Sequence, residues 1–274
     1  AFEKKDDGQY SATFHLSPCG SLMLLIDKTP VTAAPAVTPM TARTPVPVGP
    51  MAVRRMDDNN LILDYVDIKA GKEEASGLFW QRAADISFQQ NGLKESLWDH
   101  AVQFRDDLLK TPFAPDSGFE AAYHFTIEES VPETLFAVVE RPDIYTITLN
   151  GTPVSATPGA WWLDRSFGKI DIAKIARVGE NTLTIKASPM NVFHELEAAH
   201  IVGDFSLKSA KKGFTIIPSK KIAFGPWNRQ GLPLYGHRVA YTGKINVKDA
   251  EAQRYMLSLP SWKGVVAEIK VNDQ

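Results

Sequence analysis

Residues 122–151 read AYHFTIEESVPETLFAVVERPDIYTITLNG, and residues 240–273 read AYTGKINVKDAEAQRYMLSLPSWKGVVAEIKVND. In each stretch a tyrosine opens a short alternating segment. A charged turn, an apolar segment, a Pro-containing turn and a second alternating segment ending in Asn-Gly or Asn-Asp follow. Alternation of apolar and polar residues is typical of a half-buried strand. The near-repetition predicts two β-sandwich units, the second without most of its later strands, so we expect the chain to be a piece of a longer protein.

The segments around the first copy extend the same pattern. Residues 135–140 and 144–149 are rich in β-branched and aromatic side chains, and Asn150-Gly151 is a strong hairpin signal because both residues tolerate positive φ. Residues 61–68 (LILDYVDI) alternate with period two around Tyr65, as expected for one half-buried strand. Many short strands separated by turn signals predict an all-β fold, an antiparallel β-sandwich of the jelly-roll kind.

One or two short helices are expected beside the strands. The stronger signal is a set of apolar residues at helical spacing, ended by Pro112: Leu93, Leu97, Ala101, Phe104 and Leu108. Residues 171–178 (DIAKIARV) predict a helix of one or two turns, with Asp171 as its N-cap and Gly179 beyond its end.

The domain organisation follows from these patterns. We expect residues 1–28 to be end strands of a preceding domain, with 10–28 forming two short strands around a Pro-Cys-Gly turn. Residues 29–52 hold six prolines and predict a linker or strap. Residues 53–212 would form the jelly-roll sandwich and 213–274 the first part of a second sandwich. Because half a sandwich exposes open strand edges, we expect homodimerisation.

Composition excludes several classes of function. The 274 residues carry a formal charge of −2, which gives no net attraction to nucleic acid or to an anionic membrane surface. Cys19 is the only cysteine, so neither an intrachain disulfide nor a cysteine-based zinc site or redox pair can form. The apolar run at residues 22–26 is far shorter than the roughly 20 residues of a membrane span.

The order of several motifs resembles a known family. VVERPDIYTITLNGTPV, then WWLDRSFGKIDI, then VGENTLTI is similar to the galactose-binding-like jelly roll, the sugar-binding domain of family 2 glycoside hydrolases. It resembles more closely the C-terminal half of large bacterial α-L-rhamnosidase-like hydrolases. Further matching motifs are Glu195-Leu196-Glu197, Gly203-Asp204-Phe205, Gly225-Pro226-Trp227, GLPLYG at 231–236 and HLSPCGSLMLLI at 15–26.

The resemblance implies a function and a cellular location. Such a module is non-catalytic, and it binds glycan or shapes the substrate cleft of a catalytic barrel that lies upstream in the same polypeptide. The resemblance also implies an extracytoplasmic location, in the periplasm, at the cell surface or secreted.

Aromatic residues in or beside predicted loops are the first candidates for ligand binding: Trp161, Trp162, Trp227, Tyr235 and Trp262. Carbohydrate sites place flat aromatic faces against the apolar face of a pyranose. The alternative is that these rings fill sandwich cores. Because adjacent strand residues point to opposite faces, we expect one of Trp161 and Trp162 to lie inward and the other outward.

Acidic residues are the second candidates. Glu195 and Glu197 would project from one face of a strand, with Asp204 shortly after, and Asp164 follows the tryptophan pair. This group could bind calcium or grip sugar hydroxyls. It could also hold structural hydrogen bonds, or act as the carboxylate pair of a glycosidase if roughly 5 to 9.5 Å apart.

Histidine and serine patterns give no competing chemistry, because there is no zinc-site spacing, no G-x-S-x-G elbow and no Gly-rich phosphate loop. Three hypotheses therefore remain. The favoured one is a non-catalytic carbohydrate-binding or cleft-shaping module, and the others are a structural spacer without ligand and a glycosidase using the acidic group.

Overall fold

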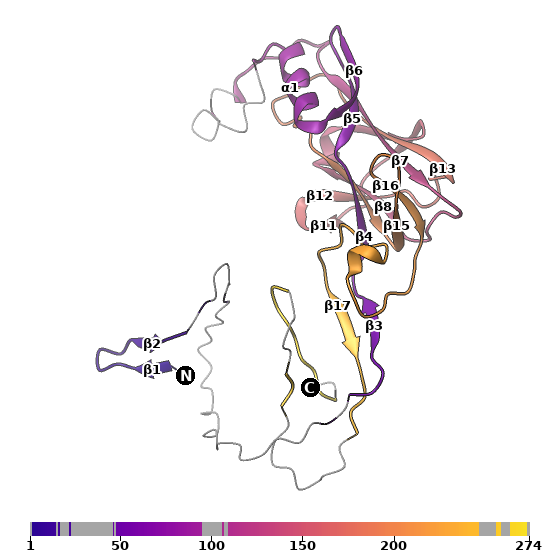
Figure 1. Ribbon diagram of the computed structural model, residues 1–274. Coiled ribbons are helices and arrows are strands. Elements are labelled where there is room, and N and C mark those ends of the chain that lie inside the picture. Colours follow the sequence, from indigo (N-terminus) through magenta and orange to yellow (C-terminus); the bar gives the residue numbers. More distant parts are fainter. Residues whose placement is uncertain are drawn as a thin grey trace. The chain divides into compact units, whose positions relative to one another are not determined.

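The computed structural model describes residues 2–14, 16, 22, 46, 48–94, 106, 109–246, 256–258 and 264–272. The chain divides into two compact units, one made of Ala1–Pro47 with Ile245–Gln274 and the other of Val48–Lys244 (Figure 1). The Pro-Cys-Gly turn, Trp262 and nearly all of the predicted Pro-rich segment before residue 48 lie outside the described residues.

The described part of the first unit contains one hairpin. Strand β1 (Phe2–Lys4) pairs antiparallel with β2 (Tyr10–Ala12), and Gly8 at the turn has a φ of 82°. Of the described residues at 256–258 and 264–272, none is in a strand. Within those described residues, the strand pattern of 122–151 is therefore not repeated near the C-terminus.

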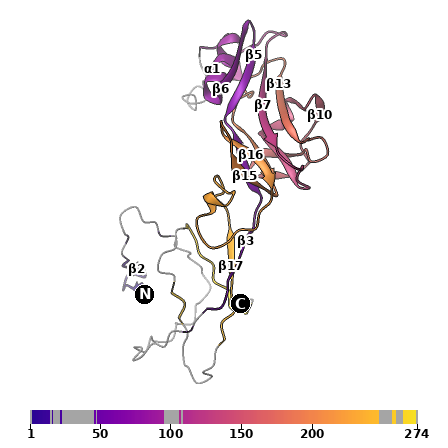
Figure 2. The same cartoon turned by 45° about the vertical axis from the view of Figure 1, so that its right-hand side comes forward.

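The unit Val48–Lys244 confirms the prediction of an all-β fold. Its strands form two large sheets that face each other (Figure 2). The five-stranded sheet has the order β11 (Trp161–Trp162), β12 (Asp164–Asp171), β8 (Leu135–Glu140), β14 (Ala199–Gly203) and β4 (Asn59–Leu63).

The eight-stranded sheet is almost entirely antiparallel. Its main path runs β10 (Thr152–Val154), β9 (Thr146–Leu149), β13 (Gly179–Ala187), β7 (Phe119–Ile127), β16 (Phe214–Pro218) and β15 (Phe205–Ser209). Strand β5 (Tyr65–Ala70) pairs with β7 and with β6 (Glu73–Phe79). The exception to antiparallel pairing is the contact of β16 with β7 at Ile216 and Ile127.

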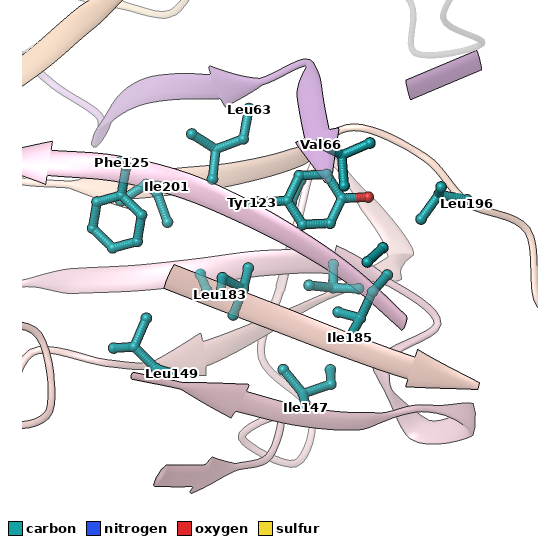
Figure 3. Packing of buried hydrophobic residues seen from close by; sticks show 14 of the residues in the cluster. Leu63, Val66, Tyr123, Phe125, Ile147, Leu149, Leu183, Ile185, Leu196 and Ile201 are labelled. Atoms are coloured by element: carbon teal, nitrogen blue, oxygen red, sulfur yellow. The ribbon is translucent and has the colours of Figure 1, made fainter. Parts of the chain in front are cut away.

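Side chains from both sheets meet in one hydrophobic core (Figure 3). Leu63 and Ile201 come from the five-stranded sheet, and Tyr123, Leu183 and Ile147 come from the eight-stranded sheet. Along β7 every second residue is buried, as the alternating sequence predicts. Burial of this apolar surface is the main stabilising contribution to the sandwich.

The segment at 61–68 differs from its prediction. It contains two strands rather than one, because the chain leaves β4 at Asp64 and enters β5 in the other sheet. The Asp64 carbonyl accepts a hydrogen bond from the Trp80 N–H at 2.9 Å, which fixes this crossing point. A period-two pattern does not reveal a change of sheet, since both strands keep alternate residues in the same core.

The predicted hairpin at Asn150-Gly151 is confirmed. The two residues have φ values of 53° and 80°, and they join β9 to β10 through the pairing of Leu149 with Thr152. The Asn150 side chain donates a hydrogen bond to Asn181 Oδ1 at 2.9 Å and so ties the turn to the start of β13.

Helices are few, and their positions differ from those expected. The α-helix α1 (Trp80–Gln90) precedes the predicted one and packs on β5 and β6. The predicted helix from Leu93 to Leu108 lies mostly outside the described residues. Residues 173–175 form a hydrogen-bonded turn rather than a helix, although Asp171 Oδ1 accepts the Ala173 N–H at 3.1 Å as a cap would.

The predicted boundary between 212 and 213 falls inside the unit Val48–Lys244. Strands β15 and β16 form a hairpin across that position, and β16 belongs to the eight-stranded sheet. The following segment contains the short 3₁₀-helix η3 (Trp227–Arg229) and β17 (Val239–Thr242), which pairs with β3 (Ala52–Arg55) (Figure 1).

Candidate ligand-binding residues

The predicted site residues lie at three places in the unit Val48–Lys244. Trp161, Trp162 and Asp164 belong to the hairpin of β11 and β12. Glu195 and Glu197 precede β14, while Asp204 follows that strand. Trp227 and Tyr235 lie in the segment between β16 and β17. The structure brings Trp162, Trp227 and Tyr235 together, but it separates Asp204 from the two glutamates.

Trp161 and Trp162 differ in their exposure to solvent. Half of the Trp161 surface is exposed (50%), whereas Trp162 is partly buried. Strand β11 is the edge strand of its sheet, and a bulge separates the two residues in their pairing with β12. Leu163 turns the chain with a φ of 63°. Adjacent positions on one short strand thus place one indole in solvent and one against the protein.

Trp162 belongs to a row of rings that we call the aromatic–histidine row: His200, Trp162, His237, Tyr235 and Trp227. The Trp162 ring centroid lies 4.9 Å from that of His200 and 6.0 Å from that of His237. The row continues from His237 to Tyr235 at 5.5 Å and from Tyr235 to Trp227 at 6.3 Å. Such edge-on and tilted ring pairs add stability beyond the area that they bury.

The side-chain polar atoms of Tyr235 and Trp227 form hydrogen bonds within the protein. The Tyr235 hydroxyl accepts the Asp57 N–H at 3.2 Å and donates to the Arg238 carbonyl at 2.7 Å. Trp227 Nε1 donates to the Tyr241 hydroxyl at 3.0 Å. Tyr235 is only 7% exposed. Tyr235 thus joins the β16–β17 segment to Asp57, just before β4, while Trp227 ties the same segment to β17.

Burial determines the charge state of His200. Burial lowers its pKa to about 4, so the ring is neutral near pH 7. Its Nδ1 lies 3.2 Å from Asn60 Oδ1, and an N–H on that nitrogen makes the contact a hydrogen bond. The neutral ring packs against Trp162 without the cost of a buried charge.

Asp164 presents an ionised carboxylate to solvent. Its Oδ1 accepts hydrogen bonds from the Ser166 N–H at 2.8 Å and the Ser166 hydroxyl at 2.7 Å. These bonds lower the pKa of Asp164 because they favour its charged form. Burial, together with the nearby charge of Asp164, raises the pKa of Glu140 on β8.

Glu195 and Glu197 lie on one side of an irregular segment, not on a strand, with Leu196 buried between them. Their carbonyls accept hydrogen bonds from the hydroxyls of Tyr145, at 2.9 Å, and Tyr123, whose hydroxyl points toward this segment (Figure 3). All four residues line one cavity of about 10 Å³. That volume accommodates about one water molecule and excludes a sugar ring.

Asp204 does not complete an acidic site with this pair. The five residues of β14 separate it from Glu197, which amounts to roughly 16 Å of extended chain. Asp204 instead forms an ion pair with Arg55. The separation exceeds the spacing of a glycosidase carboxylate pair. In the described parts of the chain, no three His, Cys, Asp or Glu side chains are grouped as metal ligands.

Sequence reasoning missed the two histidines of the row. No zinc-site spacing includes His200 or His237, so the sequence gives no sign of their role. Their role depends on the contacts of the Trp162 ring on β11 with His200 on β14 and with His237 in the β16–β17 segment, which no short-range pattern in the sequence encodes.

No protein-family model, curated protein or solved structure matches this chain. Over the residues that the structure describes, no helix combines the length and apolar character required to cross a membrane.

Proposed function

We propose that this chain is a non-catalytic accessory part of a bacterial polysaccharide-degrading glycoside hydrolase. In this proposal the unit Val48–Lys244 binds an oligo- or polysaccharide or shapes the substrate cleft. The catalytic domain lies upstream in the same polypeptide, and the enzyme works outside the cytoplasm. The order of the motifs between residues 138 and 205 supports the family assignment.

The exposed indole of Trp161 is the observation that carries the proposal. It is a large apolar ring, half exposed, on the edge strand of the five-stranded sheet. Of the rings that the structure describes, none stacks on it. An exposed indole face of this kind suits the apolar C–H face of a pyranose.

Asp164 is a polar acceptor on the same hairpin as that ring, where it pairs with Trp162. It lies on β12 of the same hairpin, and Ser166 holds its carboxylate in the ionised form. A carboxylate accepts hydrogen bonds from sugar hydroxyls and so fixes the orientation of a stacked ring. An exposed apolar ring and an ionised acceptor on one hairpin are the two kinds of group that a sugar site requires.

Calorimetry with plant-derived oligosaccharides, chosen from a glycan array, tests the proposal. We expect Trp161→Ala to weaken binding at least about tenfold, because exposed tryptophans at the centre of a contact contribute most of its energy. Tyr65→Ala is the matched control, since Tyr65 is also 50% exposed but lies on β5 of the other sheet.

Two results would contradict this function. One is glycan binding that Trp161→Ala leaves unchanged. The other is the absence of binding across the array, which would favour the structural spacer, a role already consistent with the burial of Tyr235. Release of reducing sugar by the chain, abolished by Glu195→Gln, would favour the glycosidase instead.

A further inference from the structure

A groove of about 560 Å³ lies beside the aromatic–histidine row in the unit Val48–Lys244. One wall is β3 with Met51, and the other is the segment of residues 219–224 after β16. Asp204 and Leu232 complete the lining. The volume falls within the range of small-ligand sites, which extends from roughly 300 to 1,000 Å³.

The groove has an excess of positive charge. Arg54, Lys220 and Lys221 line it and are exposed, and none of them forms an ion pair with an acidic side chain in the described residues. The fourth cation, Arg55, is already paired with Asp204. Three cations without an acidic partner are therefore gathered in one groove of a chain whose formal charge is −2.

Hydrogen bonds hold the wall at residues 219–224 in place. The Lys220 N–H donates to Ser206 Oγ at 3.0 Å, which ties the wall to β15. The Gln230 side chain bonds to Ala223 in both directions, accepting its N–H at 2.7 Å and donating to its carbonyl at 3.1 Å. A wall fixed in this way loses little conformational freedom when a ligand binds.

The groove also offers an apolar ring. Phe224 is 65% exposed, and its ring centroid lies 5.1 Å from that of Tyr241. Both aromatic surface and cationic side chains are thus available to the same occupant. The occupant that matches this combination is flat on one side and carries anionic groups.

We propose that this groove binds an acidic oligosaccharide, a chain of sugars carrying carboxylate or sulfate groups. The inference rests on the proposed carbohydrate-binding function and names the class of ligand. Arg54, Lys220 and Lys221 pair with the anionic groups, and Phe224 contacts a sugar face. Single-stranded nucleic acid also pairs its phosphates with cations and stacks on aromatic rings, and it is therefore the competing ligand in the test.

The test is calorimetry on the whole chain with hexagalacturonate and a sulfated heparin hexasaccharide, against a neutral galactan hexasaccharide. We expect at least one acidic probe to bind more tightly than the neutral one. The double variant Lys220→Gln/Lys221→Gln should then bind that probe roughly tenfold more weakly, as expected for the loss of two partly exposed ion pairs.

Three controls sharpen the result. Lys174→Gln/Lys186→Gln removes the same charge from exposed positions outside the groove and should leave affinity unchanged. Arg54→Gln is an independent groove variant and should weaken binding in the same direction. Raising NaCl from about 0.05 to about 0.3 M should weaken acidic but not neutral sugar binding.

The outcomes separate this inference from the proposed function. Equal affinity for neutral and acidic probes, lost only in Trp161→Ala, would show that the groove is not the binding site. The proposed carbohydrate-binding function would remain. Acidic-sugar binding lost in Lys220→Gln/Lys221→Gln but kept in Trp161→Ala supports the groove. No glycan binding of any kind overturns both. Tighter binding of a single-stranded oligonucleotide than of either acidic sugar also overturns the groove.

Discussion

The aromatic–histidine row and the basic groove are neighbouring regions made from similar kinds of residue, yet their side chains are used differently. In the row, Tyr235 is buried and both its hydroxyl contacts are to backbone groups of the same unit. In the groove, Phe224 is 65% exposed and Lys220 forms no ion pair with a described residue. One segment, between β16 and β17, contributes to both regions.

The difference shows that residue type alone does not identify a binding site. Trp227 and Tyr235 have the composition of a sugar platform, but their polar atoms already bond within the protein. Satisfied polar atoms and low exposure indicate a structural role. Exposed rings and unpaired charges mark the surfaces left for a ligand, here Trp161 and the groove.

Among the variants that compare the two regions, replacement of Tyr235 by alanine is expected to change the free energy of unfolding most. We expect Tyr235→Ala to lower the free energy of unfolding by about 3–5 kcal/mol, because it removes a buried ring between Trp227 and His237. Urea denaturation provides the measurement. Phe224→Ala is the control and should change stability by less than about 0.5 kcal/mol. A similar loss of unfolding free energy in both variants would show that the row and the groove do not differ in their contribution to stability.

Much of the fold could be predicted from local sequence. The Asn150-Gly151 turn and the alternation along β7 are encoded by neighbouring residues and were found. The crossing at Asp64 was not, because a strand that changes sheet keeps its period-two pattern. Helix α1 was also missed, although Ala83, Ala84 and Phe88 lie on one buried face at helical spacing.

The candidate site was less predictable than the fold. The outward position of one tryptophan followed from strand geometry, and Trp161 is the exposed member. The row was not predicted because His200 meets Trp162 only after distant strands have paired. The groove was not predicted either, since Arg54 and Lys221 are far apart in sequence. Contacts between distant segments depend on tertiary packing, which no local spacing reveals.

The stability of the row depends on pH through His200. His200 has a folded pKa of about 4 against about 6.5 when unfolded, so the unfolded chain binds its proton first as the pH falls. The stability that the neutral ring supports is complete above about pH 6.5 and is lost progressively down to about pH 4. We expect this histidine to account for about 3 kcal/mol of that loss.

Urea denaturation at a series of pH values measures this effect. The slope of stability against pH between about 4 and 6.5 should be shallower in His200→Gln than in the original chain, because glutamine takes up no proton. Subtracting the two curves removes the contribution of every other titrating group. Curves that stay parallel throughout that window would show that His200 is not the group responsible.

A smaller effect is expected at the ion pair that supports the row. Arg238 donates two side-chain hydrogen bonds to Asp57, at 2.7 and 3.1 Å, and these bonds lower the pKa of Asp57. The lowered value means that the contribution is complete above the usual pKa of 3.8 and disappears as the pH falls through the folded value. Because Arg238 is largely exposed, we expect Asp57→Asn to lower the free energy of unfolding by only about 1 kcal/mol near pH 7.

Arg54→Gln is the counterpart of Asp57→Asn in the groove. Since Arg54 has no acidic partner in the described chain, its replacement should change stability by less than about 0.5 kcal/mol at any pH. Urea denaturation of Asp57→Asn and Arg54→Gln at a series of falling pH values tests both expectations. The Asp57→Asn difference should vanish in acid while the Arg54→Gln curve follows that of the original chain. A pH-dependent loss in Arg54→Gln would mean that this arginine pairs within the folded protein, and the groove would then lack the charge that our inference requires.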